Sequence, residues 1–237
     1  MSTYVLIHGA WHGAWCWDRV VPLLEQLGHN VVTPDLPGHG DDKTPLHKVT
    51  LQAYADKVCE VINVQAEPVI LVGHSMGGMV ITRAAEECSS NIETLVYLSA
   101  VLLGNGVPMI EDPEALIIPS MTLSADKSFF TIKEEMIKSA FYEDCSDTDI
   151  AWAKSKLTPQ SAKAFGTSAA TVTTEENYGC LTRVYIECLR DQAITPAVQK
   201  AMYTNTPCAK VISMDTDHSP FLSAPGALTE HLHSLSS

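Results

Sequence analysis

The sequence is short of positive charge. It has 15 Lys and Arg residues against 28 Asp and Glu residues, which gives a formal net charge of −13. Nucleic acids and anionic membrane surfaces bind basic patches, so neither is expected as a partner. A strongly anionic substrate would also be repelled. A small neutral molecule is therefore the expected ligand.

Long hydrophobic runs are also missing. No apolar run approaches the ~20 residues that a membrane-spanning helix needs. The chain begins Met-Ser-Thr and passes directly into the apolar segment TYVLIH, so no secretory signal peptide is expected.

Cysteines are present but show no paired arrangement. Their number, seven, is odd, and no C-x-x-C motif occurs. Cys59 and Cys188 lie in apolar segments, where a reduced thiol behaves as a small hydrophobic side chain. This usage favours a reducing compartment over a disulfide framework and predicts a cytoplasmic protein.

Cofactor signatures are absent as well. There is no G-x-G-x-x-G dinucleotide fingerprint, and His8, His12 and His39 do not have the spacing of metal ligands. We therefore expect no cofactor and no metal. The 237 residues suffice for one α/β domain, and a homodimer is among the oligomeric states that the sequence leaves open.

Short β-branched runs alternate with helical patterns along the chain. The expected strands are Tyr4–His8, Asn30–Asp35, Val69–Val72, Thr94–Ser99, Arg183–Leu189 and Lys210–Met214. The expected helices are Trp15–Leu27, Leu51–Val64, Ser75–Glu87, Pro196–Tyr203 and Ala224–Leu235. Near-continuous apolar strands separated by helices predict a mostly parallel sheet with helices on both faces.

One long segment interrupts this alternation. Residues 105–179 contain no convincing sheet strand, whereas amphipathic helical pieces occur around Lys133–Phe141 and Thr148–Lys156. A long insertion in a compact domain usually has a function, often as a lid. We interpret residues 105–179 as a helical cap on a core of residues 1–104 and 180–237. A subdomain without a role in catalysis is the alternative.

The segment Pro68–Gly78, PVILVGHSMGG, carries the most specific motif. An apolar strand leads into Gly73-His74-Ser75-Met76-Gly77, and a helical pattern follows. This is the G-x-S-x-G nucleophile elbow in its strand-turn-helix context. The sharp turn exposes the serine hydroxyl above the carboxyl end of the sheet, so Ser75 is the candidate nucleophile.

A serine hydroxyl needs a general base, and three histidines follow Ser75 in the chain. His231 and His233 lie two residues apart in the expected terminal helix and therefore point away from each other. His218 follows the strand Lys210–Met214, in a loop at the carboxyl end of the sheet. His218 is therefore the predicted base.

The acid that orients this base is expected one strand earlier, because the elbow fold uses the chain order Ser, acid, His. The strand RVYIECL ends at Arg190-Asp191-Gln192. Asp191 is the predicted acid, which would accept the Nδ1 hydrogen of His218. Asp215 and Asp217 remain rivals, although near neighbours in sequence rarely reach the required side-chain geometry.

A tetrahedral intermediate also needs hydrogen-bond donors for its oxyanion. The backbone N–H of Met76 follows the nucleophile directly and is one candidate. The N–H of Ala10, in the loop after the first strand, is the other, with Gly9 allowing a close backbone approach. We expect Gly9 and Trp11 to line the substrate pocket.

These motifs together resemble a known family. LIHGAWHGAWCW, the GHSMGG elbow, the RDQ acid loop and the DH base loop are similar to the α/β-hydrolase superfamily. They resemble most the branch of plant methylesterases, hydroxynitrile lyases and related bacterial carboxylesterases. The resemblance covers almost the whole chain and is weakest in the cap. It implies the α/β-hydrolase fold and a serine carboxylesterase acting on small neutral esters.

Two alternatives remain beside the esterase. The Hevea-type lyases that this chain resembles carry a threonine directly after the strand-ending histidine and a lysine directly after the catalytic histidine. This sequence has Gly9 and Ser219 at those positions, so the lyase chemistry lacks its specific groups. The other alternative is a ligand receptor that keeps the fold with little turnover, and an intact triad counts against it.

Overall fold

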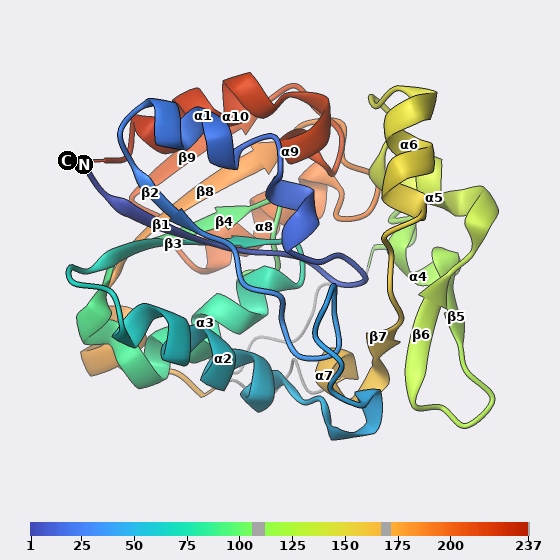
Figure 1. Cartoon of the computed structure of the whole chain (residues 1–237), viewed down its shortest axis with the longest axis horizontal. Helices are drawn as coiled ribbons and strands as arrows, with labels where there is room; N and C mark the ends of the chain where they lie inside the picture. The colour runs from blue at the N-terminus through green and yellow to red at the C-terminus, as the bar shows by residue number, and fades with distance from the viewer. Residues whose placement is uncertain (106–111, 167–171, 237) are drawn as a thin grey trace.

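Six parallel strands form the central sheet of the computed structural model, which describes residues 1–105, 112–166 and 172–236. The strands are β1 (Thr3–Ile7), β2 (Asn30–Val32), β3 (Val69–His74), β4 (Ile92–Leu98), β8 (Thr182–Cys188) and β9 (Lys210–Met214). Their order across the sheet is β2-β1-β3-β4-β8-β9 (Figure 1). All six correspond to predicted strands, and the predicted α/β class with a parallel sheet is confirmed.

Helices cover both faces of this sheet. The helices α1 (Val21–Gln26) and α10 (Pro225–His233) pack together on one face, and α2 (Leu51–Asn63) and α3 (Gly77–Cys88) lie on the other (Figure 1). Because both faces are covered, every residue of β3 is buried. This double coverage explains why the strands read as unbroken apolar runs rather than as an alternation.

Helix boundaries follow capping residues and prolines. The Thr50 side chain accepts a hydrogen bond from the Ala53 N–H and caps α2. The predicted helix Trp15–Leu27 is divided into a 3₁₀ helix at Ala14–Trp17 and α1, because Pro22 fits only the first turn of a helix. The remaining core helices are α8 (Pro196–Asn205) and the short α9 (Pro220–Ser223).

The insertion contains a sheet, so the expectation of no strand between residues 105 and 179 is wrong. The antiparallel strands are β5 (Met121–Leu123), β6 (Phe129–Ile132) and β7 (Gln160–Ser161). The helices around them are α4 (Ile117–Ser120), α5 (Ile137–Phe141), α6 (Asp147–Lys154) and α7 (Ala162–Gly166). Residues 106–111 and 167–171 of the expected cap, including its Pro108–Met109 start, lie outside the described residues.

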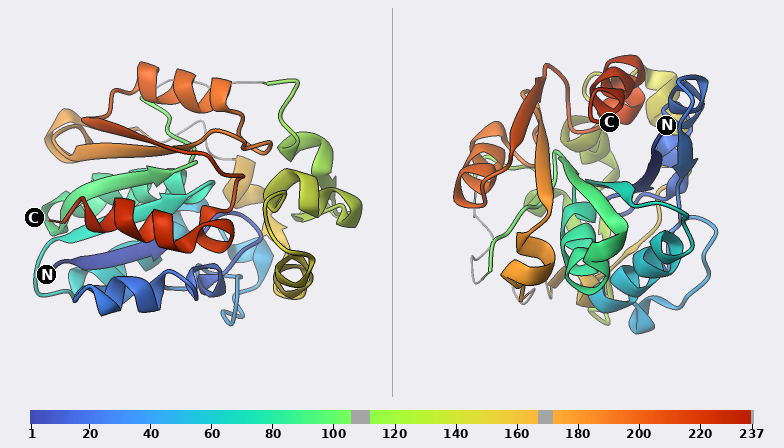
Figure 2. Two further views of the ribbon diagram at one scale, coloured as in Figure 1. Left: turned by 90° about the horizontal axis from the view of Figure 1, so that it is seen from above. Right: turned by 90° about the vertical axis from the view of Figure 1, so that its left-hand side faces the viewer.

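These elements gather beyond the carboxyl ends of the central strands, and two perpendicular views agree on this placement (Figures 1 and 2). We call residues 112–166 the cap. Its hairpin is closed by Ser124, whose Oγ accepts hydrogen bonds from the backbone N–H groups of Ser128 and Phe129. None of the helices in the described ranges is long and apolar enough to cross a membrane.

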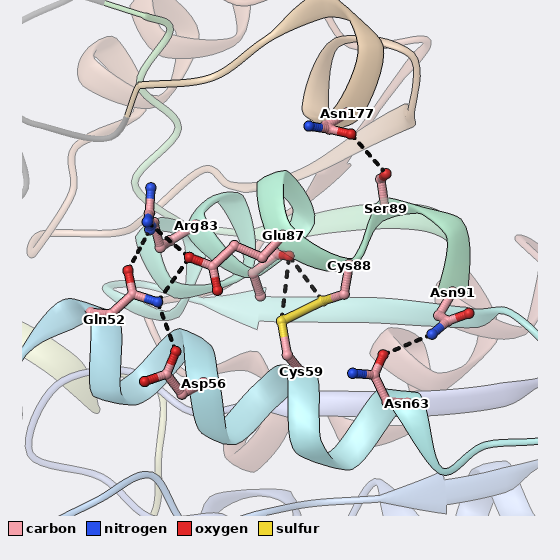
Figure 3. Close-up of a disulfide and its surroundings, with 11 residues drawn as sticks. Gln52, Asp56, Cys59, Asn63, Arg83, Glu87, Cys88, Ser89, Asn91 and Asn177 are labelled. Atoms are coloured by element: carbon pink, nitrogen blue, oxygen red, sulfur yellow. Dashed lines mark hydrogen bonds and ion pairs between the residues drawn. A yellow bond between two sulfur atoms is a disulfide. The ribbon is translucent and has the colours of Figure 1, made fainter.

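A disulfide joins α2 to α3, which corrects the interpretation of Cys59 as a reduced thiol. Cys59 and Cys88 are bonded, with their Cα atoms 6.1 Å apart (Figure 3). An ion pair between Arg83 and Glu87 (2.8 Å) lies beside the bridge. The other five cysteines, among them the buried Cys188, are free. The bridge forms because α2 and α3 pack side by side, which cysteine spacing alone does not show.

Candidate active site

Ser75 stands at the junction of β3 and α3, where the backbone is strained. Its φ is +54°, a left-handed value that a non-glycine residue rarely adopts. A Cβ on Gly73 would come within 2.6 Å of the Gly77 carbonyl oxygen, so the tight turn requires glycine there. The Ser75 side chain is half-buried, whereas its neighbours His74 and Met76 are buried. The elbow therefore singles out one serine for contact with a ligand.

The loop after β1 lies directly against this serine. A Cβ on Gly9 would lie 2.9 Å from the Ser75 Cβ and 3.0 Å from His74 Nδ1, so only glycine allows this approach. Ala10 follows with 3% of its surface exposed, and Met76 is 2% exposed. Ala10 and Met76, whose N–H groups are the predicted oxyanion donors, therefore belong to two separate segments that meet at the elbow.

Asp191 and His218 meet at the ends of β8 and β9. The Nδ1 atom of His218 lies 2.7 Å from Asp191 Oδ2, and both side chains are buried. The other Asp191 oxygen accepts backbone hydrogen bonds from Ala193 (2.7 Å) and Ile194 (3.0 Å). These donors hold the carboxylate in one orientation. The carboxylate in turn fixes His218 with its hydrogen on Nδ1 and leaves Nε2 free to accept a proton.

The two rival acids have other partners. Asp215 lies 3.0 Å from the Nε atom of Arg190 and is largely exposed. The Asp217 carboxylate accepts hydrogen bonds from the Asp144 N–H (3.0 Å) and the Ser223 hydroxyl (2.8 Å). Burial raises the Asp217 pKa. Of the three carboxylates, only Asp191 contacts His218 in the described structure.

Two further histidines support these loops. The Nε2–H of His74 donates to the His218 carbonyl oxygen (2.8 Å), which ties the base loop to the elbow. The Nδ1–H of His8 donates to the Gly9 carbonyl (2.8 Å), while His8 Nε2 accepts the Leu36 N–H (3.1 Å). A peptide unit is planar, so the bond to the Gly9 carbonyl also orients the Ala10 N–H. Burial lowers the His8 pKa to about 4, and the ring is therefore neutral at pH 7.

A family model and several known proteins match this chain over nearly its whole length. The model of the "Alpha/beta hydrolase family" matches residues 4–231. The chain belongs to this family. Methylesterase 9 of Arabidopsis thaliana is 30% identical, over 98% of this chain and 97% of its own length. The alpha-hydroxynitrile lyase of the same plant is 32% identical, over 98% of this chain and 96% of its own length.

The solved structures give the same family. The crystal structure of polyneuridine aldehyde esterase superposes with a TM-score of 0.89 at 26% identity, and the match covers 100% of both chains. Because full-length matches include both esterases and a lyase, the α/β-hydrolase fold does not by itself choose between these activities. The side chains at the site must decide.

Sequence reasoning missed two side chains that hold the acid of this hydrolase. The Ser99 hydroxyl donates to Asp191 Oδ2, and Ser99 has a φ of +40°. The Gln199 amide lies 3.4 Å from the same oxygen and donates to the Ile194 carbonyl at 2.7 Å. Ser99 was recognisable as a polar residue at the end of a predicted strand. Gln199 gave no such signal, because it lies within α8.

Trp11 lies between this machinery and the cap of the hydrolase. Its backbone carbonyl accepts the Thr158 N–H (2.9 Å), and its indole N–H donates to the Phe130 carbonyl (3.1 Å). Trp11 also lines a pocket of about 500 Å³ whose other lining residues, in the described structure, all belong to the cap, both apolar (Ile132, Ile137, Leu157) and charged (Glu134, Lys154); Gly9, Ser75 and His218 are not among them. In the described residues, no three His, Cys, Asp or Glu side chains are grouped to hold a metal ion.

Proposed function

We propose that this α/β hydrolase is a serine carboxylesterase that acts on small, mostly neutral carboxylic esters. The observation that carries the proposal is the buried Asp191–His218 hydrogen bond on a loop that His74 ties to the elbow, where Ser75 is held at a positive φ. The methylesterase and esterase relatives support the same reaction class. The net charge of −13 favours neutral over anionic substrates.

The reaction follows from the role of each group. Ser75 Oγ attacks the ester carbonyl while His218 Nε2 takes its proton, and Asp191 stabilises the resulting imidazolium. The N–H groups of Ala10 and Met76 bind the oxyanion. Each such donor typically stabilises the transition state by about 3 kcal/mol. The alcohol leaves with the proton from His218. Water, deprotonated by His218, then attacks the acyl-enzyme and releases the carboxylic acid.

A cyanohydrin lyase is disfavoured by the space around Gly9. A larger side chain there would press on Ser75 and His74, because even a Cβ would lie within 3.0 Å of both. Ser219, after the base, carries no ammonium group to bind cyanide. An assay for mandelonitrile cleavage separates the lyase from the esterase. A receptor with this fold would bind an ester without turning it over.

We also propose a cytoplasmic location. Five of the seven cysteines are free, and three of these, Cys16, Cys145 and Cys188, are buried. Proteins in oxidising compartments usually pair their cysteines, so this usage supports a reducing environment. The Cys59–Cys88 disulfide counts against a reducing compartment.

The deciding experiment is hydrolysis of p-nitrophenyl esters of increasing acyl length. We expect rapid release that is greatest for short chains and falls more than about 10³-fold in Ser75→Ala, because no other group can form the acyl-enzyme. Ser89→Ala, at the opposite end of α3, is the matched control and should keep its activity. Full activity in a folded Ser75→Ala protein would exclude the proposed mechanism. No release from any ester would favour the lyase or the receptor.

A further inference from the structure

His12 connects the oxyanion loop to the cap. Its Nδ1 atom lies 2.8 Å from the Ala10 carbonyl oxygen, and its Nε2 atom lies 2.6 Å from the Tyr142 hydroxyl. Tyr142 follows α5 and belongs to the cap. The two side chains are 1% and 0% exposed, so water does not compete for either hydrogen bond.

The Ala10 carbonyl and the Tyr142 hydroxyl together hold the His12 ring in one tautomer and one orientation. Burial lowers the His12 pKa to about 3, so the ring is neutral and holds one N–H. Burial raises the Tyr142 pKa, which keeps its hydroxyl protonated. Because the Ala10 carbonyl can only accept, the ring hydrogen lies on Nδ1, and the Tyr142 hydroxyl donates to the lone pair of Nε2. The opposite tautomer would place a lone pair against that carbonyl.

The loop is thereby fixed on both sides of Ala10. His8 holds the carbonyl before Ala10, and His12 holds the carbonyl after it. The following residue, Trp11, has a φ of +63°, a strained value that persists only when the surroundings impose it. The bond from His12 is one such constraint on the Ala10–Trp11 peptide. Without it, Ala10 could rotate and its N–H would lose its direction.

We propose that Tyr142 and His12 are positioning residues that let the cap set the direction of the Ala10 oxyanion donor. Tyr142 acts by holding the His12 ring in place through Nε2, and His12 acts through the Ala10 carbonyl. The inference rests on the proposed esterase function and deepens it. The cap thus contributes to the rate of the chemical step as well as to the shape of the pocket.

The experiment compares Tyr142→Phe with Tyr54→Phe. Each variant removes one buried hydroxyl that contacts a histidine Nε2, but Tyr54 contacts His39 (3.0 Å), which does not bind the Ala10 carbonyl. We expect Tyr142→Phe to lower kcat about tenfold with KM within twofold, since the donor acts mainly on the transition state. Tyr54→Phe should keep kcat within twofold. Equal kcat values in the two variants would overturn the proposal.

Two substitutions of His12 test the step through the tautomer. The amide N–H₂ of Asn can take the place of Nδ1–H, whereas that of Gln reaches toward the place of Nε2. His12→Asn should therefore keep about tenfold more kcat than His12→Gln, with both melting temperatures measured to compare their folding. Equal losses at equal stability would overturn the role assigned to Nδ1.

The proposed function is checked separately in the same series with Ser75→Ala. If Ser75→Ala keeps its activity, the esterase mechanism fails whatever the tyrosine variants show. If activity depends on Ser75 but not on the Tyr142 hydroxyl, only the positioning role fails.

Discussion

Four buried histidines should make this fold sensitive to mild acid. His8, His12, His39 and His74 are each at most 1% exposed, and burial lowers the pKa of every one of them. A histidine with a lowered pKa binds fewer protons in the folded than in the unfolded state. The stability it contributes is present above its unfolded pKa near 6.5 and is lost as the pH falls toward its folded pKa.

The size of this loss follows from the folded pKa values of His8 and His12. With folded pKa values of about 4 for His8 and about 3 for His12, lowering the pH from 7 to 5.5 costs about 1 kcal/mol for each. The two together cost about 2 kcal/mol, which lowers Tm by about 4 °C for a chain of this length. His39 and His74, whose pKa values are also lowered, reduce the stability further as the pH falls.

Thermal unfolding followed by circular dichroism at pH 7 and pH 5.5, at one ionic strength, measures this loss. His12→Asn removes one of the four groups and should reduce the loss between the two pH values by about 1 kcal/mol. An unchanged or higher Tm at pH 5.5 would refute the reasoning. It would mean that these histidines are protonated in the folded protein or that the unfolded chain does not take up the protons.

Two further predictions concern the disulfide and the acid loop. Reducing the Cys59–Cys88 bridge, which spans 29 residues, should cost about 3–4 kcal/mol and lower Tm by about 7 °C. A Cys59→Ala/Cys88→Ala variant should not respond to reductant, and an unchanged Tm in the reduced wild type would contradict the prediction. Ser99→Ala should lower kcat about tenfold, because Asp191 loses a hydroxyl donor. Ser120→Ala, which removes a comparably buried hydroxyl in the cap, is the control, and equal kcat values would contradict the assignment.

The central sheet was predictable because short apolar, β-branched runs alternate with helical patterns along the chain. The cap sheet was not, since β7 (Gln160–Ser161) is polar and β5 (Met121–Leu123) is short and mixed, so neither stands out as an apolar run. The hairpin between β5 and β6 depends on the Ser124 hydroxyl and on Lys127 at a φ of +59°. Such local side-chain turns are hard to separate from polar loop residues in a single sequence.

At the site, the sequence predicted the positions that the chain order determines. Asp191 and His218 follow consecutive sheet strands, and the structure brings them together. The partners of Ser99 and Tyr142 could not be identified from the sequence, because they lie 92 and 130 residues away. Those contacts depend on which strands are neighbours and on how the cap sits over the core. Neither property is encoded in a local pattern.

The contacts between the cap and the core indicate that some cap positions tolerate substitution and that others do not. Beside the Tyr142–His12 bond, the Thr158 N–H donates to the Trp11 carbonyl, and the Asp144 N–H donates to Asp217 beside the base. The last two use backbone donors, which most substitutions at Thr158 or Asp144 would preserve. The Tyr142 bond needs a side-chain hydroxyl at one position. From the proposed role of Tyr142 we therefore expect substitutions at other cap residues to change substrate range at little cost to the chemical step, and substitutions at Tyr142 to lower the rate for every ester tested.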